Sequence, residues 1–324
     1  GILQLLFLFI FVKKYFLINF SFTFYIDKKI KIFFSKLLPS IFSSGVTQIN
    51  ILVGTIIASY QASAVSYLYY ADRIYQINLA VAGIAIGTII LPNLSKYVKN
   101  KNKFKLTKLQ NKSLELSLFL SLPATFALLI ASEEIVSALF GYGSFNEESV
   151  KNSSTALFYF AIGLPAFSMI KIFSSFVFAQ NDTKTPFYFS LISVVINILI
   201  SVSLFSNVGF IIIPIATTIS SYINGFLLMV FVINKNYFGF NNKFFFQILK
   251  ILIANLFCMG IFYILISIFK YLLDNLNFQY SQNFYRPELS NVLSSVLLII
   301  RIFNECGLVI FLPIGECQLF TPFY

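Results

Sequence analysis

Residues 74–91 read IYQINLAVAGIAIGTIIL, an apolar stretch without a charged side chain. An α-helix needs about 20 such residues to cross the hydrocarbon layer of a membrane. Similar stretches recur along the 324-residue chain, of which 58% is hydrophobic and 11% charged. Soluble domains are about 25% charged, and disordered chains are less apolar, so both classes are excluded. The sequence predicts an all-α, polytopic transmembrane helix bundle.

The apolar blocks give about nine candidate spans. They cover approximately residues 1–20, 37–62, 74–95, 113–140, 154–179, 187–206, 208–233, 246–272 and 290–313. The first block is short and is interrupted by Lys13 and Lys14, and the chain opens with Gly1 and without a signal peptide pattern. We therefore expect a fragment from which earlier spans are missing.

Lysine placement predicts the orientation of the spans. Seven lysines and no acidic residue occur from Lys96 to Lys112, after the third span, and further lysines follow the first, fifth and seventh spans. The intervening connections are acidic or uncharged, with Glu133, Glu134, Glu147 and Glu148 after the fourth span. Because cytoplasmic loops are rich in Lys and Arg, the lysine-rich connections should be cytoplasmic. The net charge of +11 is then explained by topology and lipid headgroups, rather than by nucleic-acid binding.

Several kinds of chemistry have no support in the sequence. There is no His, and Cys258, Cys306 and Cys317 form no CxxC pair, so neither a zinc site nor a disulfide framework is expected. No nucleophile elbow, zinc-protease or P-loop motif occurs. We expect a protein that is not an enzyme and carries neither a cofactor nor a metal.

The segment SYLYYADR, residues 66–73, precedes the apolar stretch and contains the main candidate site. Ser59, Ser66 and Arg73 are spaced seven apart and would share one face of a continuous helix. Asp72 is adjacent to Arg73 and cannot simply neutralise it, because neighbours on a helix point in different directions. An arginine facing a membrane cavity suits phosphate oxygens. The alternative is an arginine that extends to the membrane interface beside tyrosines.

Two other spans contain polar residues. Lys171 falls inside the fifth span, where a lysine marks a candidate binding site or extends its side chain to the nearby cytoplasmic end. The second span contains Gln48 and Asn50, which either connect helices or line a wet cavity. In later spans, Asn197 and Asn224 are expected to form hydrogen bonds between helices. The segment from Asp182 to Pro186 (DTKTP) is typical of a helix start.

An ordered series of motifs resembles the MurJ (MviN) lipid II flippase family, within the superfamily of multidrug, oligosaccharidyl-lipid and polysaccharide exporters. The motifs lie between about Pro39 and Pro186, and include GVTQIN at 45–50, SYLYYADR at 66–73, GIAIGT at 83–88, LPNLS at 91–95, GLPAF at 163–167 and DTKTP at 182–186. Gly54 stands where the family often has Asp, a residue linked in some members to sodium.

The resemblance implies a partial two-lobed exporter fold corresponding to spans six to fourteen. Residues 1–36 would form the last span of a missing N-terminal lobe with a basic cytoplasmic linker. Residues 37–240 would form the C-terminal six-helix lobe, and residues 241–324 two additional spans with an anomalous tail.

The resemblance also implies a function. The protein would move lipid II, the undecaprenyl-diphosphate-linked muropeptide, from the inner to the outer leaflet of the bacterial inner membrane by alternating access. The implied substrate-binding residues are Arg73, Asp72, Ser66, Ser59 and Lys171. Membrane lipids and cell-wall synthesis proteins would be its other partners. The alternatives are another lipid-linked polysaccharide or drug exporter of this fold, a membrane glycosyltransferase, and a structural scaffold.

Overall fold

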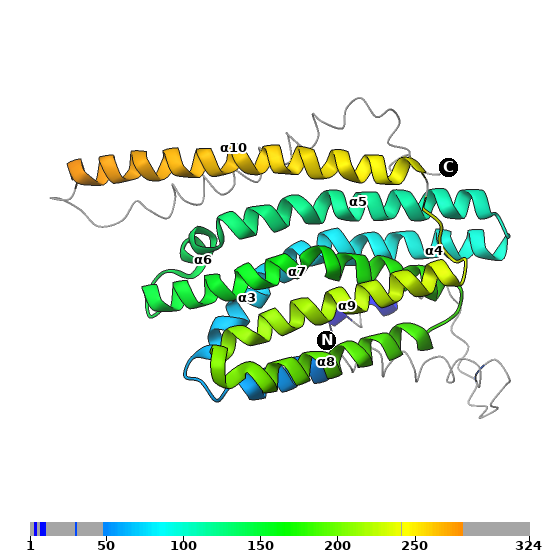
Figure 1. Cartoon of the computed structure of the whole chain (residues 1–324), viewed down its shortest axis with the longest axis horizontal. Helices are drawn as coiled ribbons and strands as arrows, with labels where there is room; N and C mark the ends of the chain where they lie inside the picture. Colours follow the sequence, from blue (N-terminus) through cyan, green and yellow to red (C-terminus); the bar gives the residue numbers. More distant parts are fainter. Residues whose placement is uncertain (1–2, 5–6, 11–29, 31–47, 241, 281–324) are drawn as a thin grey trace. The chain divides into compact units, whose positions relative to one another are not determined.

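Apolar α-helices make up the described part of the chain (Figure 1). The structure is a computed structural model that describes residues 3–4, 7–10, 30, 48–240 and 242–280. The chain divides into two units, Gly1–Pro39 and Ser40–Tyr324, and the features below belong to the second. In order, the elements are Gln48–Ala58, α3 (Ala64–Leu79), the π-helix η1 (Ala80–Ala85), α4 (Ile86–Lys99), α5 (Lys103–Ile130), α6 (Ser132–Phe140), α7 (Glu147–Ala179), α8 (Lys184–Val208), the 3-10 turn η2 (Gly209–Ile211), α9 (Ile212–Asn234) and α10 (Asn242–Tyr280). The predicted all-α membrane fold is confirmed.

Five apolar helical stretches in the described residues are long enough to cross a membrane. They are Ala64–Lys99, Lys103–Ile130, Glu147–Ala179, Lys184–Asn234 and Phe244–Ile268. Lys184–Asn234 contains both α8 and α9, which pack against each other after a reversal at Gly209, where φ is 73°. The predicted spans at 154–179, 187–206 and 208–233 therefore match α7, α8 and α9. The predicted span at 290–313 and most of those at 1–20 and 37–62 lie outside the described residues.

The prediction of one span over residues 113–140 is wrong. Helix α5 ends at Ile130, and α6 begins at Ser132 as a separate helix. Ala131, with φ −115° and ψ 25°, leaves the helical conformation between them. Glu133 and Glu134 occupy the first turn of α6, where carboxylates stabilise a helix N-terminus. Apolar residues continue across this break, so hydropathy alone does not reveal it.

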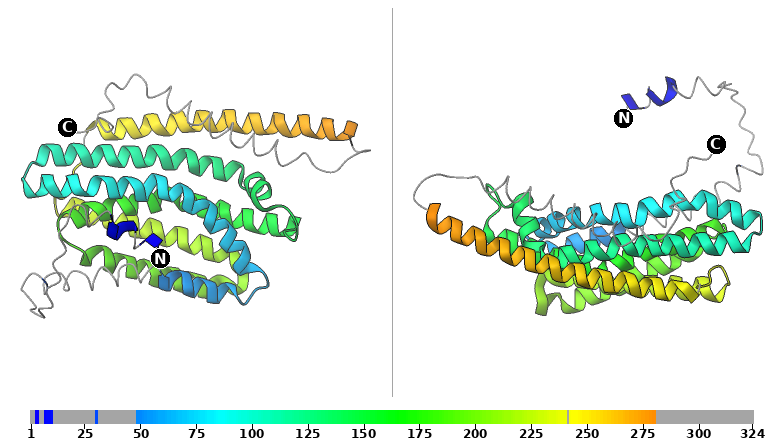
Figure 2. Two further views of the ribbon diagram at one scale, coloured as in Figure 1. Left: turned by 180° about the vertical axis from the view of Figure 1, so that it is seen from behind. Right: turned by 90° about the horizontal axis from the view of Figure 1, so that it is seen from above.

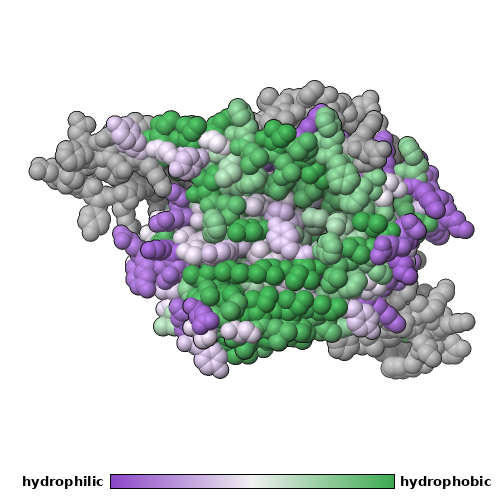
Figure 3. Space-filling view, viewed as in Figure 1, coloured by the Kyte–Doolittle hydropathy of each residue, from purple (hydrophilic) through white to green (hydrophobic). Residues whose placement is uncertain are grey.

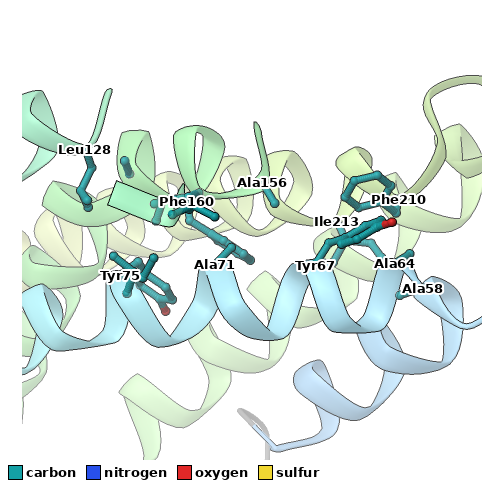
Figure 4. Packing of buried hydrophobic residues seen from close by; sticks show 14 of the residues in the cluster. Ala58, Ala64, Tyr67, Ala71, Tyr75, Leu128, Ala156, Phe160, Phe210 and Ile213 are labelled. Carbon is teal, nitrogen blue, oxygen red and sulfur yellow. The ribbon is translucent and has the colours of Figure 1, made fainter. Parts of the chain in front are cut away.

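The packing of α3 on α7 places the candidate site. Tyr67, Ala71 and Tyr75 are buried on one face of α3 (Figure 4). The ring of Tyr75 stacks on that of Phe160 in α7, with centroids 5.2 Å apart and planes at 14°. Ala71 and Ala156 are fully buried, and such small residues let helix backbones approach closely in membranes. This contact fixes which face of α3 remains exposed.

The π-helix η1 interrupts the long helix that runs from α3 into α4, shown from behind in Figure 2. A π turn is usually a short insertion within an α-helix. The buried Ser117 hydroxyl of α5 donates to the carbonyl oxygen of Ala82 at 2.7 Å. A Cβ added at Gly83 would lie 3.2 Å from the Cα of Ser168 in α7. Neighbouring helices therefore hold η1 through a hydrogen bond and through close backbone contact.

A buried polar junction joins three helices. The Asn197 amide nitrogen of α8 donates to the Asn50 side-chain oxygen at 2.8 Å and to the Thr217 hydroxyl of α9 at 3.2 Å. The Ser201 hydroxyl donates to the Asn197 side-chain oxygen at 3.1 Å. Asn50 therefore connects helices, as one of the two alternatives predicted, whereas Gln48 is exposed.

Polar groups gather at the two ends of the described bundle. Figure 1 shows the connections 99–103, 179–184 and 234–242 at one end, and 130–147 and 208–212 at the other. The first group contains the lysine-rich connections, as the alternation of spans predicts. Between the ends, the visible surface is mostly apolar with a paler central patch (Figure 3). This distribution is typical of helices that cross a membrane.

Candidate functional site

Arg73 lies on the exposed face of α3, just before the apolar run 74–91 of the candidate membrane-spanning helix Ala64–Lys99. Its Nη2 donates a hydrogen bond to the Tyr69 hydroxyl at 2.9 Å. The guanidinium carbon also lies 4.6 Å from the centroid of the Tyr69 ring, within the range of a cation–π contact. A neutral phenol thus contacts the guanidinium and leaves its positive charge in place.

Asp72 points to a different side of α3, as its position next to Arg73 predicts. Its half-buried carboxylate accepts a hydrogen bond from the Gln76 side chain one turn later. Gln76 can satisfy a carboxylate oxygen without adding charge. In this structure the Asp72 carboxylate is thus hydrogen-bonded to Gln76 and not to Arg73.

Only two of the three residues spaced seven apart share a helix. Ser66 and Arg73 both lie on α3 and are exposed. The helix is broken over residues 59–63, with Ser63 in a left-handed conformation at φ 60°. Ser59 precedes this turn, and its hydroxyl donates to the carbonyl oxygen of Ile56 at 2.7 Å. The expectation of a continuous face from Ser59 to Arg73 is wrong, because the chain turns between the two helices.

Lys171 is exposed on α7, beside Gly83 of η1. A Cβ added at Gly83 would lie 3.4 Å from the Cγ of Lys171, so the lysine stem crosses η1 there. Gly83 follows Arg73 by ten residues, which corresponds to about 15 Å along a helix. Arg73 and Lys171 therefore lie at separate positions along the α3–η1 helix and do not form one cluster.

Tyr69 is the functional candidate that the sequence reasoning missed. In the sequence, these tyrosines enter only as interfacial neighbours in one of the two alternatives for Arg73. The signal that could have identified Tyr69 is its position four residues before Arg73, because residues four apart meet on a helix surface.

The exposed face of α3 is suited to binding an anion. Ser66, Tyr69 and Arg73 supply two hydroxyls and a guanidinium along two turns of helix. Beyond them the same face is apolar, with Ile77 66% and Val81 55% exposed. Among the described residues, no group of three or more His, Cys, Asp or Glu side chains is placed to hold a metal. The face therefore offers hydrogen-bond donors and one positive charge.

Sequence comparisons decide the family. The family model described as "Lipid II flippase MurJ" matches residues 1–281. The chain belongs to the lipid II flippase MurJ family. It is 42% identical over 202 residues to a probable lipid II flippase MurJ of Rhizobium meliloti (strain 1021), covering 62% of this chain and 38% of the relative. A relative from Rickettsia prowazekii (strain Madrid E) with the same description is 38% identical over 225 residues, covering 69% of this chain and 44% of the relative.

Solved transporter structures share the fold of this chain. A structure titled "Lipid II flippase MurJ, inward closed conformation" has a TM-score of 0.67 and 23% identity, covering 91% of this chain and 57% of that one. An outward-facing multidrug resistance MATE family transporter has a TM-score of 0.55 and 14% identity, covering 84% of this chain and 60% of that one. The fold is thus shared with the wider transporter superfamily.

This MurJ family member is a multi-pass protein of the bacterial inner membrane. It spans about two fifths of the length of the curated relatives it matches.

Proposed function

We propose that this chain forms a membrane lobe that takes part in moving lipid II from the inner to the outer leaflet by alternating access. Family membership supports the substrate, because the matching relatives are described as probable lipid II flippases. The segments from Gln48–Ala58 to α9 would be the six-helix lobe of residues 37–240. Helix α10 would belong to the additional C-terminal spans.

One observation carries the assignment of the substrate site. Arg73 presents its guanidinium on an exposed face of α3, with the neutral Tyr69 as its hydrogen-bond partner, while the Asp72 carboxylate is bound to Gln76. A charge within a membrane span is costly and usually faces a cavity or a binding site. The diphosphate of a lipid-linked precursor has anionic oxygens that a guanidinium can bind through two parallel hydrogen bonds.

The other predicted residues have separate roles in this proposal. Ser66 would donate a hydrogen bond to the same headgroup from the next turn of α3, and Asp72 would hold Gln76 at its edge. Lys171 would contact the anionic headgroup beside Gly83. Ser59 would contribute from the turn before α3.

The proposed function can be tested by expressing the chain in bacteria depleted of their own lipid II flippase. Lipid II that reaches the outer leaflet is measured with an externally added enzyme that cleaves it. We expect Arg73→Ala to reduce this signal more than tenfold, since it removes charge-assisted hydrogen bonds. Lys184→Ala, which removes an exposed lysine at the start of α8, is the matched control. The proposal fails if the unaltered chain neither supports translocation nor binds lipid II. Unchanged translocation in Arg73→Ala would refute the site.

A further inference from the structure

We propose that Tyr69 is a positioning residue that aims Arg73 at the phosphate oxygens of the lipid-linked substrate and adds a hydrogen-bond donor of its own. Two contacts carry this proposal: the hydrogen bond from Nη2 of Arg73 to the Tyr69 hydroxyl at 2.9 Å, and the guanidinium carbon 4.6 Å from the ring centroid. Because Tyr69 acts through Arg73, its role depends on the proposed function.

The geometry of α3 explains the direction in which the guanidinium points. Side chains on a helix lean toward its N-terminus and cover the preceding turn. Arg73 therefore extends back over the turn that carries Tyr69. A free arginine side chain samples many rotamers, and fixing one costs about 2 kcal/mol of entropy. Two simultaneous contacts with Tyr69 restrict the guanidinium before the substrate arrives.

The chemistry of the pair leaves donors available for a ligand. The hydroxyl of Tyr69 accepts from Arg73, so its own proton can be donated to a second acceptor. The guanidinium has five N–H donors, and one is directed at Tyr69. The remaining donors and the hydroxyl proton can converge on an anionic oxygen. Ser66 is exposed three residues before Tyr69 and extends the donor row by one turn.

Neighbouring tyrosines do not share this arrangement. Tyr70 directs its ring at Phe140 and Phe145, with centroid distances of 4.7 and 5.0 Å. Tyr75 is buried against α7. Tyr69 is 53% exposed on the same face as Arg73. The proposed role therefore belongs to one tyrosine of the segment, and Tyr70 provides a matched control.

The experiment measures binding of undecaprenyl diphosphate to the full 324-residue chain in nanodiscs of zwitterionic lipid. Tyr69→Phe keeps the ring and removes the hydroxyl, so affinity should fall about three- to tenfold. Tyr69→Leu also removes the ring and should weaken binding further. Tyr70→Phe should change affinity less than about twofold, because its hydroxyl lies outside the donor row. Thermal melting of each variant checks that the bundle remains folded.

A double-mutant cycle separates positioning from a general structural role. Arg73→Gln should reduce affinity at least about tenfold, since the charged fork is lost. Adding Tyr69→Phe to Arg73→Gln should reduce affinity by a smaller factor than in the unaltered chain, because there is no guanidinium left to position. An equal loss in both backgrounds would overturn the positioning role.

The outcomes distinguish this proposal from the proposed function. If Arg73→Gln weakens binding while Tyr69→Phe and Tyr69→Leu bind normally, the role of Tyr69 is refuted and the site at Arg73 stands. If Arg73→Gln also binds normally, the substrate site itself is wrong. If the unaltered chain does not bind the probe, both proposals fail.

Discussion

The three-helix junction at Asn197 allows a quantitative test of what holds the lobe together. Asn197→Leu keeps a side chain of similar size and removes three hydrogen bonds, at 2.8, 3.2 and 3.1 Å, to Asn50, Thr217 and Ser201. Asn197 is 5% exposed, so water cannot readily replace these partners. The junction links Gln48–Ala58 to α8 and α9, and its loss should loosen all three.

The expected cost follows from measured hydrogen bonds between membrane helices. Such bonds contribute about 0.6 kcal/mol on average and about 1.7 kcal/mol at most. Two of the three bonds cross between helices, and the third, from Ser201, lies within α8. With a similar contribution from each, they give about 2 kcal/mol, with an upper bound of about 5 kcal/mol. Little hydrophobic gain offsets this loss, because lipid tails are as apolar as the new leucine. A loss of this size should lower the melting temperature by roughly 4–8 °C.

Asn224→Leu is the matched control. Asn224 lies on α9, is 6% exposed, and its side-chain oxygen has no hydrogen-bond partner in the described part of the chain. Replacing an unsatisfied buried oxygen by an apolar group should be neutral or stabilising. Both variants are melted in the same detergent, and the retained monodisperse fraction is measured against temperature. Equal melting temperatures for Asn197→Leu and Asn224→Leu would refute the claim that the junction's hydrogen bonds stabilise the lobe.

Two further predictions concern helix contacts and helix ends. Gly163→Ala should destabilise the α7–α9 contact by about 1–3 kcal/mol, because the added Cβ would lie 2.8 Å from the Thr218 hydroxyl. Gly260→Ala is the control: the new Cβ would have open space around it, so the melting temperature should be unchanged or slightly higher. Asp182→Ala should cost about 1 kcal/mol, because the carboxylate accepts from the backbone nitrogens of Lys184 and Thr185 at 3.0 and 3.1 Å. Amide hydrogen exchange should then accelerate in the first turn of α8, and unchanged protection there would contradict the capping role.

Hydropathy located the apolar part of α7 but missed the polar, capped turns where the helix begins. The predicted span 154–179 coincides with the C-terminal end of α7 at Ala179 but misses its start at Glu147. Those first residues are polar, and the Asn146 side chain caps them by accepting from the Ser149 backbone nitrogen at 2.9 Å. Apolar content therefore marks the part of a helix inside the membrane, and capping chemistry marks where the helix begins.

The candidate site was only partly predictable from the sequence. It depends on the turn at residues 59–63 and on the pairing of Arg73 with Tyr69. No Gly or Pro occurs between Ser59 and Ser66, so the sequence contains no strong signal for the break at 59–63. The separation of Asp72 from Arg73 was predictable, since adjacent residues point apart on a helix. Asn224 was expected to form a hydrogen bond between helices, yet the structure leaves its side-chain oxygen unsatisfied. Such partners depend on how neighbouring helices rotate, which local sequence does not encode.

The π turn at Ala80–Ala85 sets the angular phase of the two halves of its helix. Such a turn winds in one residue more than an α-helix would, and each residue of an α-helix turns the chain by about 100°. Winding the same residues as a regular α-helix would swing everything from Ile86 onward by about 100° around the axis. Gly87, whose carbonyl oxygen accepts from the Ser175 hydroxyl at 3.2 Å, would then face away from α7. The winding of this stretch is thus constrained by rotation, and the close contact of Gly83 with Ser168 also limits which residue types fit there.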